Sequence, residues 1–116
     1  MNIEDLRTYC LALPYVEERF PFDDTTLVFC IGGHMFALVD LERADRVNLK
    51  CKPDVAVELR ERYEGVVPGW HMNKKHWNTV YLQADVPTTV LHEMIDNSYR
   101  LVYSGLPKRD RESMPL

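Results

Sequence analysis

The spacing of apolar side chains predicts where the helices of this chain lie. Over residues 3–13, apolar residues recur every three or four positions, which is the period of a helix with one buried face. Asn2 precedes this run and is suited to cap it, and Pro14 ends it because proline cannot continue a helix. The chain therefore opens with one amphipathic helix.

Two further helices are predicted where proline and glycine bracket an apolar stripe. Pro53 stands at the first-turn position of one, and its stripe runs until Gly65. Pro87 begins the other, whose longer stripe ends before Gly105. Proline at the start and glycine at the end is the order that helix termini favour.

Between the first two helices, β-branched and aromatic residues predict three strands. Residues 25–31 and 34–39 are separated by Gly32-Gly33, the strongest turn signal in the chain, and are expected to form a hairpin. Residues 46–51 alternate between apolar and polar positions, as a strand does when one face is buried and the other meets water.

Two more strands are predicted after the second helix, over residues 69–73 and 76–83, with a turn between them. The order of elements is then α-β-β-β-α-β-β-α. Strands joined by short hairpins and flanked by helices argue for a two-layer α+β domain with an antiparallel sheet. We expect residues 1–116 to form one such domain, with a flexible tail over residues 108–116.

Composition and charge narrow the classes of function. The chain has 46% hydrophobic and 28% charged residues, as globular domains do, and no apolar run approaches the roughly 20 residues that cross a bilayer. Its N-terminus is acidic, so we expect no signal peptide, no membrane partner and a cytoplasmic location. With 18 acidic residues against 14 Lys and Arg, the net charge is −4, so any surface for nucleic acid must be local.

The sequence does not predict a catalytic nucleophile or a bound cofactor. Cys10, Cys30 and Cys51 are odd in number, widely spaced and set in apolar stretches, a pattern typical of buried thiols in a reducing compartment. Ser98 lies within a predicted helix rather than at the strand-turn-helix elbow of a hydrolase. No glycine-rich phosphate loop is present, so we expect no catalytic residue and no cofactor.

The most concentrated chemistry lies in residues 68–78, which hold both tryptophans, two of the four histidines, two adjacent lysines and two asparagines. Aromatic faces, turn lysines and amides together suit nucleic acid. They suit a groove for a peptide or small ligand equally well. A structural interpretation also stands, in which the tryptophans pack on a helix and the lysines form a solvated turn. The candidate contact residues in this segment are Trp70, His71, Asn73, Lys74, Lys75, His76, Trp77 and Asn78.

The histidines do not predict a metal site. His71 and His76 are five residues apart, which on one continuous strand would place them on opposite faces, although the turn predicted between them can change this; His34 lies on a separate hairpin. No helical His-x-x-x-His pattern, paired cysteines or nearby acidic ligand accompanies them. We therefore expect no metal, and an acid–base role for either histidine would require a carboxylate beside it in a cleft.

Several strings of this chain resemble the MmcQ/YjbR family. The most specific is Pro68-Gly69-Trp70-His71-Met72-Asn73-Lys74-Lys75-His76-Trp77-Asn78. Shorter strings extend the resemblance over residues 4 to about 106. They are Leu13-Pro14 with Glu17, Pro21-Phe22, Phe36-Ala37-Leu38, Leu49-Lys50-Cys51-Lys52-Pro53 and Ile95-Asp96-Asn97-Ser98-Tyr99-Arg100-Leu101-Val102.

The resemblance implies a fold and a partner. Members are described as two-layer α+β domains, likened to frataxin-like and type III secretion-chaperone-like architectures. The family is commonly labelled DNA-binding, because its sheet resembles the "double wing" surface of a phage transcription activator. Carried onto this chain, the resemblance adds Lys50 to the contact residues and makes DNA the expected partner. The alternative is a chaperone-like module for a peptide or small ligand, and neither interpretation indicates an oligomeric state.

Overall fold

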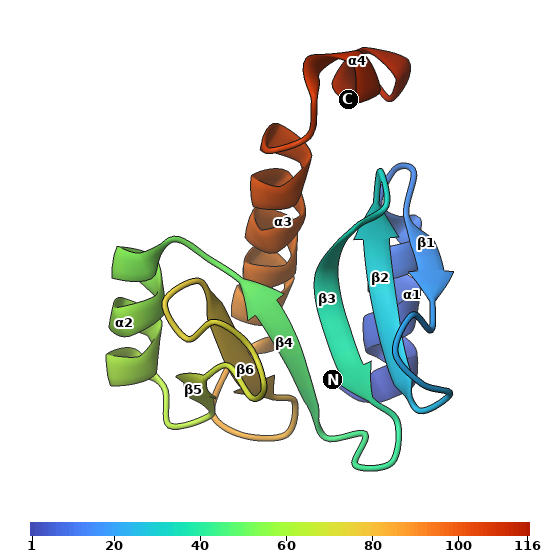
Figure 1. Cartoon of the computed structure of the whole chain (residues 1–116). Helices are drawn as coiled ribbons and strands as arrows, with labels where there is room; N and C mark the ends of the chain where they lie inside the picture. The colour runs from blue at the N-terminus through green and yellow to red at the C-terminus, as the bar shows by residue number, and fades with distance from the viewer.

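The computed structural model describes residues 1–116 and contains one six-stranded antiparallel sheet, with strand order β1-β2-β3-β4-β6-β5 (Figure 1). The α+β class and the antiparallel sheet are as the sequence predicts. The elements in chain order are α1 (Ile3–Ala12), β1 (Glu17–Arg19), β2 (Thr26–Ile31), β3 (His34–Asp40), β4 (Arg46–Lys50), α2 (Pro53–Arg62), β5 (Val66–Pro68), β6 (Trp77–Tyr81), α3 (Thr88–Ser104) and α4 (Lys108–Ser113).

Local sequence signals act where the sequence analysis placed them. The Asn2 side chain accepts a hydrogen bond from the Asp5 backbone N–H at 2.8 Å and caps α1. Gly32 and Gly33 have φ angles of 58° and 80°, the left-handed conformations that a tight hairpin turn needs and that glycine adopts without strain. Pro53 is the first residue of α2.

The predicted strand over residues 69–73 is wrong, because the strand that pairs with β6 lies earlier, at Val66–Pro68. His71 has φ 57°, which an extended strand does not allow. The Asn73 carbonyl accepts hydrogen bonds from the backbone N–H groups of His76 and Trp77, at 3.1 and 3.0 Å, so this stretch is a compact loop. We call residues 69–76 the signature loop.

Two short elements were missed by the sequence analysis. One is β1, an edge strand of three residues with too short a pattern to recognise. The other is α4, which lies where a flexible tail was predicted. Tyr103 donates a hydrogen bond to the Met114 carbonyl at 3.0 Å, and Met114 packs on the main core, so tertiary contacts hold this helix in place.

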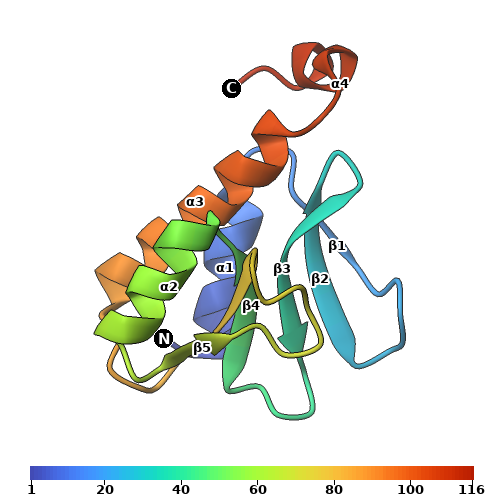
Figure 2. The ribbon, with the colours of Figure 1, turned by 60° about the vertical axis from the view of Figure 1, so that its left-hand side comes forward.

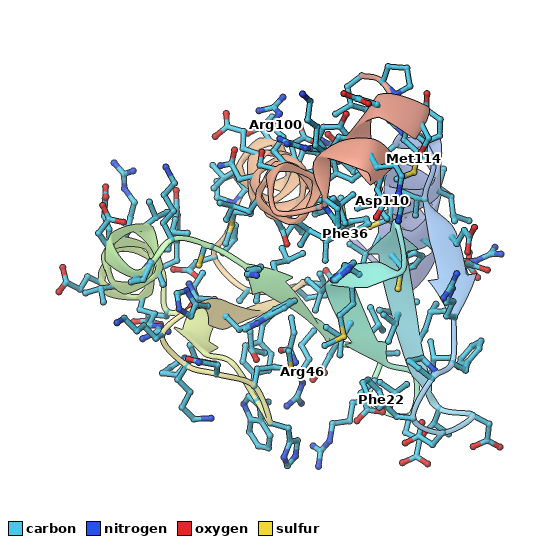
Figure 3. All side chains as sticks on the ribbon, turned by 45° about the horizontal axis from the view of Figure 1, so that its top comes forward. Phe22, Phe36, Arg46, Arg100, Asp110 and Met114 are labelled. Carbon is cyan, nitrogen blue, oxygen red and sulfur yellow. The ribbon has the colours of Figure 1, made fainter.

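The helices α1, α2 and α3 lie on one side of the sheet, as Figure 2 shows. Most of the hydrophobic core lies between them and the sheet, and Phe36 in Figure 3 marks this layer. The other face, which we call the open face, carries no helix. A second apolar cluster lies there, formed by Val28, Cys30, Leu38 and Trp77 and contacted by Met35 and Met72. The fold therefore has two layers and one sheet face for other contacts.

Strands β3 and β4 pair at only two positions and separate toward Lys50 (Figure 1). Ser98 of α3 bridges the separated strands. Its hydroxyl donates to the Phe36 carbonyl at 2.6 Å and accepts from the Lys50 backbone N–H at 2.9 Å. Because Ser98 is fully buried, these two bonds satisfy backbone groups that would otherwise lose their partners.

Candidate binding groove on the open sheet face

The signature loop is fixed to the open face by a closed set of hydrogen bonds. The Trp70 backbone N–H donates to the Thr79 hydroxyl at 2.9 Å, and that hydroxyl donates to the Asn48 side-chain carbonyl. The Asn48 amide then donates to the Trp70 carbonyl at 3.1 Å. Each member is satisfied by the others, so the backbone at Trp70 has one position on the sheet.

The loop is also held from the opposite side by α2. The Arg60 guanidinium donates to the Asn78 side-chain oxygen at 2.6 Å, to the Trp77 carbonyl at 3.3 Å and to the Lys74 carbonyl. The Asn78 amide donates to the Ala56 carbonyl at 3.2 Å. A buried amide and one arginine thus join the helix layer to the base of the loop.

Close packing inside the loop requires a glycine at position 69. A Cβ atom there would lie 2.9 Å from the Trp77 backbone oxygen and from the Trp77 Cβ. The Lys74 ammonium donates to the Gly69 carbonyl at 2.9 Å, and the Asn73 side chain accepts from the Lys75 backbone N–H at 2.9 Å. The loop is therefore formed before any partner arrives.

Between this loop and strands β2 and β3 lies a groove of about 820 Å³, which we call the open-face groove. Its apolar lining includes Met35, Leu38, Met72 and Trp77. Two aromatic side chains in the lining are strongly exposed, Phe22 at 63% and Trp70 at 46%. In Figure 3, Phe22 and Arg46 lie on the side of the sheet away from the helices.

Arg46 is a groove residue whose charge is paired and whose side chain is only 12% exposed. Its guanidinium forms two hydrogen bonds to Asp45, at 2.7 and 3.0 Å, and lies 5.2 Å from the Trp70 ring centroid and 4.8 Å from that of Tyr81. The hydrogen bonds from Arg46 hold the pKa of the Asp45 carboxyl below its ordinary value and raise the pKa of Arg46. Arg46 therefore orients Trp70 and is itself neutralised.

The remaining charges of the groove also balance. Its lining contains two cations, Arg43 and Arg46, and two carboxylates, Asp40 and Glu42. The Arg43 Nε lies 3.8 Å from an Asp40 carboxylate oxygen. The groove is therefore close to neutral rather than positive.

The structure separates the predicted contact residues into three groups. Trp70, His71, Asn73 and Trp77 line the open-face groove. Three others belong to the signature loop but do not line the open-face groove: Lys74, Lys75 and His76. The last two have other surroundings: Lys50 lines cavities beside α3, where β3 and β4 separate, and Asn78 is 1% exposed and hydrogen-bonded to α2.

Several groove residues were missed by the sequence analysis. For Asn48 and Arg46, the sequence showed only that they occupy polar positions of an alternating strand, and this does not predict contact with the signature loop. Phe22 and Met35 carry no pattern that links them to residues 69–76, because the contact depends on the order β2-β3-β4-β6 in the sheet.

The cysteines and histidines are the side chains that a nucleophile or a metal site would use. The three cysteines are free and buried, and burial raises the pKa of Cys10 to about 12 and that of Cys30 and Cys51 above the ordinary value. Neither His71 nor His76 forms a side-chain hydrogen bond or ion pair with a carboxylate. No group of three His, Cys, Asp or Glu side chains is placed to hold a metal ion. None of the helices has the length and hydropathy to span a membrane.

Comparison with known proteins shows several relatives of similar length. The model of the YjbR family matches residues 11–101. The uncharacterized protein YbdF of Escherichia coli O157:H7 is 38% identical over 110 residues, which cover 94% of this chain and 90% of that protein. The uncharacterized protein YjbR of Escherichia coli strain K12 is 34% identical over 113 residues, which cover 97% and 96%.

A solved structure has the same architecture throughout. The crystal structure of Deinococcus radiodurans protein DR2400, which carries a DUF419 domain, superposes with a TM-score of 0.91 at 42% sequence identity. The match covers 99% of this chain and 88% of that one. The fold described above is thus also found by experiment in a similar protein.

Proposed function

The chain belongs to the YjbR family, and from the geometry of its open-face groove we propose that it is a binding module for an extended peptide segment bearing an aromatic or large aliphatic side chain. The observation that carries this proposal is a groove of about 820 Å³ with an apolar floor and exposed aromatic side chains at Phe22 and Trp70. Exposed tryptophan beside an apolar pocket is typical of the residues that dominate binding energy in protein interfaces.

The rigidity of the signature loop supports binding. Trp70 is held by Thr79 and Asn48 from the sheet, and the loop base is held by Arg60 from α2. Because the loop is already ordered, binding costs little conformational entropy there, and more of the contact energy contributes to affinity.

The side chains of the floor favour a peptide over a single rigid ligand. Met35 and Met72 are flexible and polarisable, so they can adapt to different apolar side chains. The rim carries both signs of charge, at Arg43 and Asp40, beside the amide of Asn73. Such a rim offers donors and acceptors to a peptide backbone without selecting one charge.

DNA binding is the second candidate, and the observation that favours it is the exposed Lys75 in the signature loop, which forms no ion pair. A DNA-binding face gains most of its affinity from unpaired cations opposite phosphates. Here the groove is balanced in charge, Arg46 is paired with Asp45, and the chain carries a net charge of −4. These features give the peptide the stronger support.

A competition between the two partner classes tests the proposal. Peptides selected from a phage-displayed random library would be synthesised with a fluorescent label, and their anisotropy would be compared with that of labelled duplex DNA at about 50 mM salt, where electrostatic binding is strong. We expect aromatic peptides to bind and to change Trp70 fluorescence. The substitution Trp70→Ala should weaken them by about 2 kcal/mol, or about thirtyfold.

The chain offers a matched control for the other exposed aromatic. Phe20 and Phe22 are 49% and 63% exposed, but only Phe22 lines the groove. Phe22→Ala should weaken the selected peptide, and Phe20→Ala should change its affinity less than twofold (about 0.4 kcal/mol). Failure to select any peptide that depends on Trp70 would refute the proposal. DNA binding with a salt slope that falls by about 0.9 per lysine in Lys74→Ala and Lys75→Ala would instead favour the second candidate.

A further inference from the structure

A second cavity lies on the helix-covered side of the sheet, between α2 and α3, with a volume of about 490 Å³. This interhelical cavity is separate from the open-face groove, since none of its lining residues is shared with that groove. Its volume falls within the range of about 300–1,000 Å³ that is usual for small-molecule sites.

The cavity exists because both helices are fixed to the sheet by buried hydrogen bonds. Asn78 of β6 binds the Ala56 carbonyl and so sets the position of α2. Ser98 binds the carbonyl of Phe36 in β3 and the backbone N–H of Lys50 in β4, and so sets the position of α3. The space between the helices is therefore part of the fold.

Half of the lining of the interhelical cavity is apolar, since six of its twelve residues are hydrophobic. Leu49 comes from β4, Leu59 from α2, and Met94 and Leu101 from α3. A ligand with a hydrocarbon or aromatic body would bury its apolar surface there, which favours binding by about 25 cal/mol per Å².

The charged lining of this cavity has one sign only. Lys50, Lys52 and Arg100 line it, and no Asp or Glu does, although the chain has 18 acidic residues and 14 Lys and Arg. None of the three cations forms an ion pair. The carboxylate of Asp96, one turn before Arg100, accepts a hydrogen bond from Tyr9 of α1 instead.

We propose that the interhelical cavity binds a small amphipathic organic anion, whose carboxylate meets Lys50, Lys52 and Arg100 while its apolar body packs on Leu49, Leu59 and Met94. Asn97, which also lines the cavity, supplies an amide to the same head group. Unpaired cations beside an apolar floor complement both halves of such a molecule, and neither half alone uses the whole site. This site is independent of the peptide groove, so either can fail without the other.

Titration of isotope-labelled protein with three probes, followed by backbone amide NMR shifts, tests the proposal. The probes are octanoate, the neutral 1-octanol, and inorganic phosphate. We expect octanoate to shift amides in residues 50–52 and 97–101, with about tenfold higher affinity than 1-octanol because the carboxylate contacts cations. Phosphate alone should bind more weakly than octanoate, since it has no apolar body.

Paired variants separate the cavity from general charge effects. Lys52 and Arg100 are exposed, so Lys52→Gln with Arg100→Gln should fold normally and weaken octanoate about tenfold. The matched control, Arg62→Gln with Arg109→Gln, removes the same charge from exposed positions that line neither the cavity nor the groove and should leave the affinity unchanged. Equal binding of octanoate and 1-octanol, equal loss in both double variants, or shifts centred on residues 70–77 would each overturn the proposal.

Discussion

Ser98 provides the sharpest test of how this sheet is held open. Its hydroxyl, with no exposed surface, links the Phe36 carbonyl to the Lys50 backbone N–H at 2.6 and 2.9 Å. In Ser98→Ala both backbone groups lose their partner. A buried group left unsatisfied costs about 1–3 kcal/mol, and the full penalty applies at Phe36, whereas half-buried Lys50 regains part of it from water.

Alanine recovers about 0.5 kcal/mol through its higher helix propensity, so the net loss should be about 2 kcal/mol. For a domain of this size that corresponds to a fall in Tm of roughly 8 °C. Urea unfolding followed by far-UV circular dichroism measures the change in unfolding free energy. Ser104→Ala, at an exposed position of the same helix, should change it by less than about 0.5 kcal/mol.

Amide hydrogen exchange gives a second measurement of the same contact. The Lys50 amide should exchange faster in Ser98→Ala than in the parent protein, because its acceptor is gone. The reasoning fails if the unfolding free energy of Ser98→Ala lies within about 0.5 kcal/mol of the parent value and the Lys50 amide stays protected. The bridge between β3 and β4 would then not be a stabilising contact.

Two further predictions concern the signature loop and its supports, and a third concerns the turn before β5. Gly69→Ala should destabilise the protein by about 1–3 kcal/mol in thermal unfolding, because its Cβ would lie 2.9 Å from the Trp77 backbone oxygen. Arg60→Met should accelerate amide exchange across residues 70–76 while α3 stays protected, since the loop carbonyls lose their donor. Two backbone N–H groups lower the pKa of Asp85 below 3.8, so its stabilising effect is present above that pH and is lost as pH falls through the folded pKa. The difference in unfolding free energy between the parent and Asp85→Asn should therefore shrink below about pH 4, and a constant difference would contradict this assignment.

Local signals in the sequence were enough for most of the secondary structure. The apolar period of residues 3–13, the prolines at helix starts and the glycine pair at 32–33 all act through near neighbours in the chain, and the structure confirms them. The wrong strand at residues 69–73 was also predicted from near neighbours in the chain. Apolar and polar residues alternate there as in a strand, but the left-handed His71 and the turn at Asn73 form because Thr79 and Arg60, distant in sequence, bind the loop.

The amino-acid sequence was sufficient to predict the fold class, the family and the concentration of surface chemistry in residues 68–78. Which of those residues meet one another depends on how the strands pair in three dimensions. The sheet order brings Phe22, Met35 and Arg46 to Trp70. Alternation along β6 sends Asn78 to the helix side, and Lys50 lines cavities beside α3 because β3 and β4 separate there. Periodicity is a property of residues close together in the chain, whereas a groove is made by strands that pair across long stretches of chain. The walls of the groove, its charge balance and the separate cavity between α2 and α3 therefore follow from the three-dimensional structure alone.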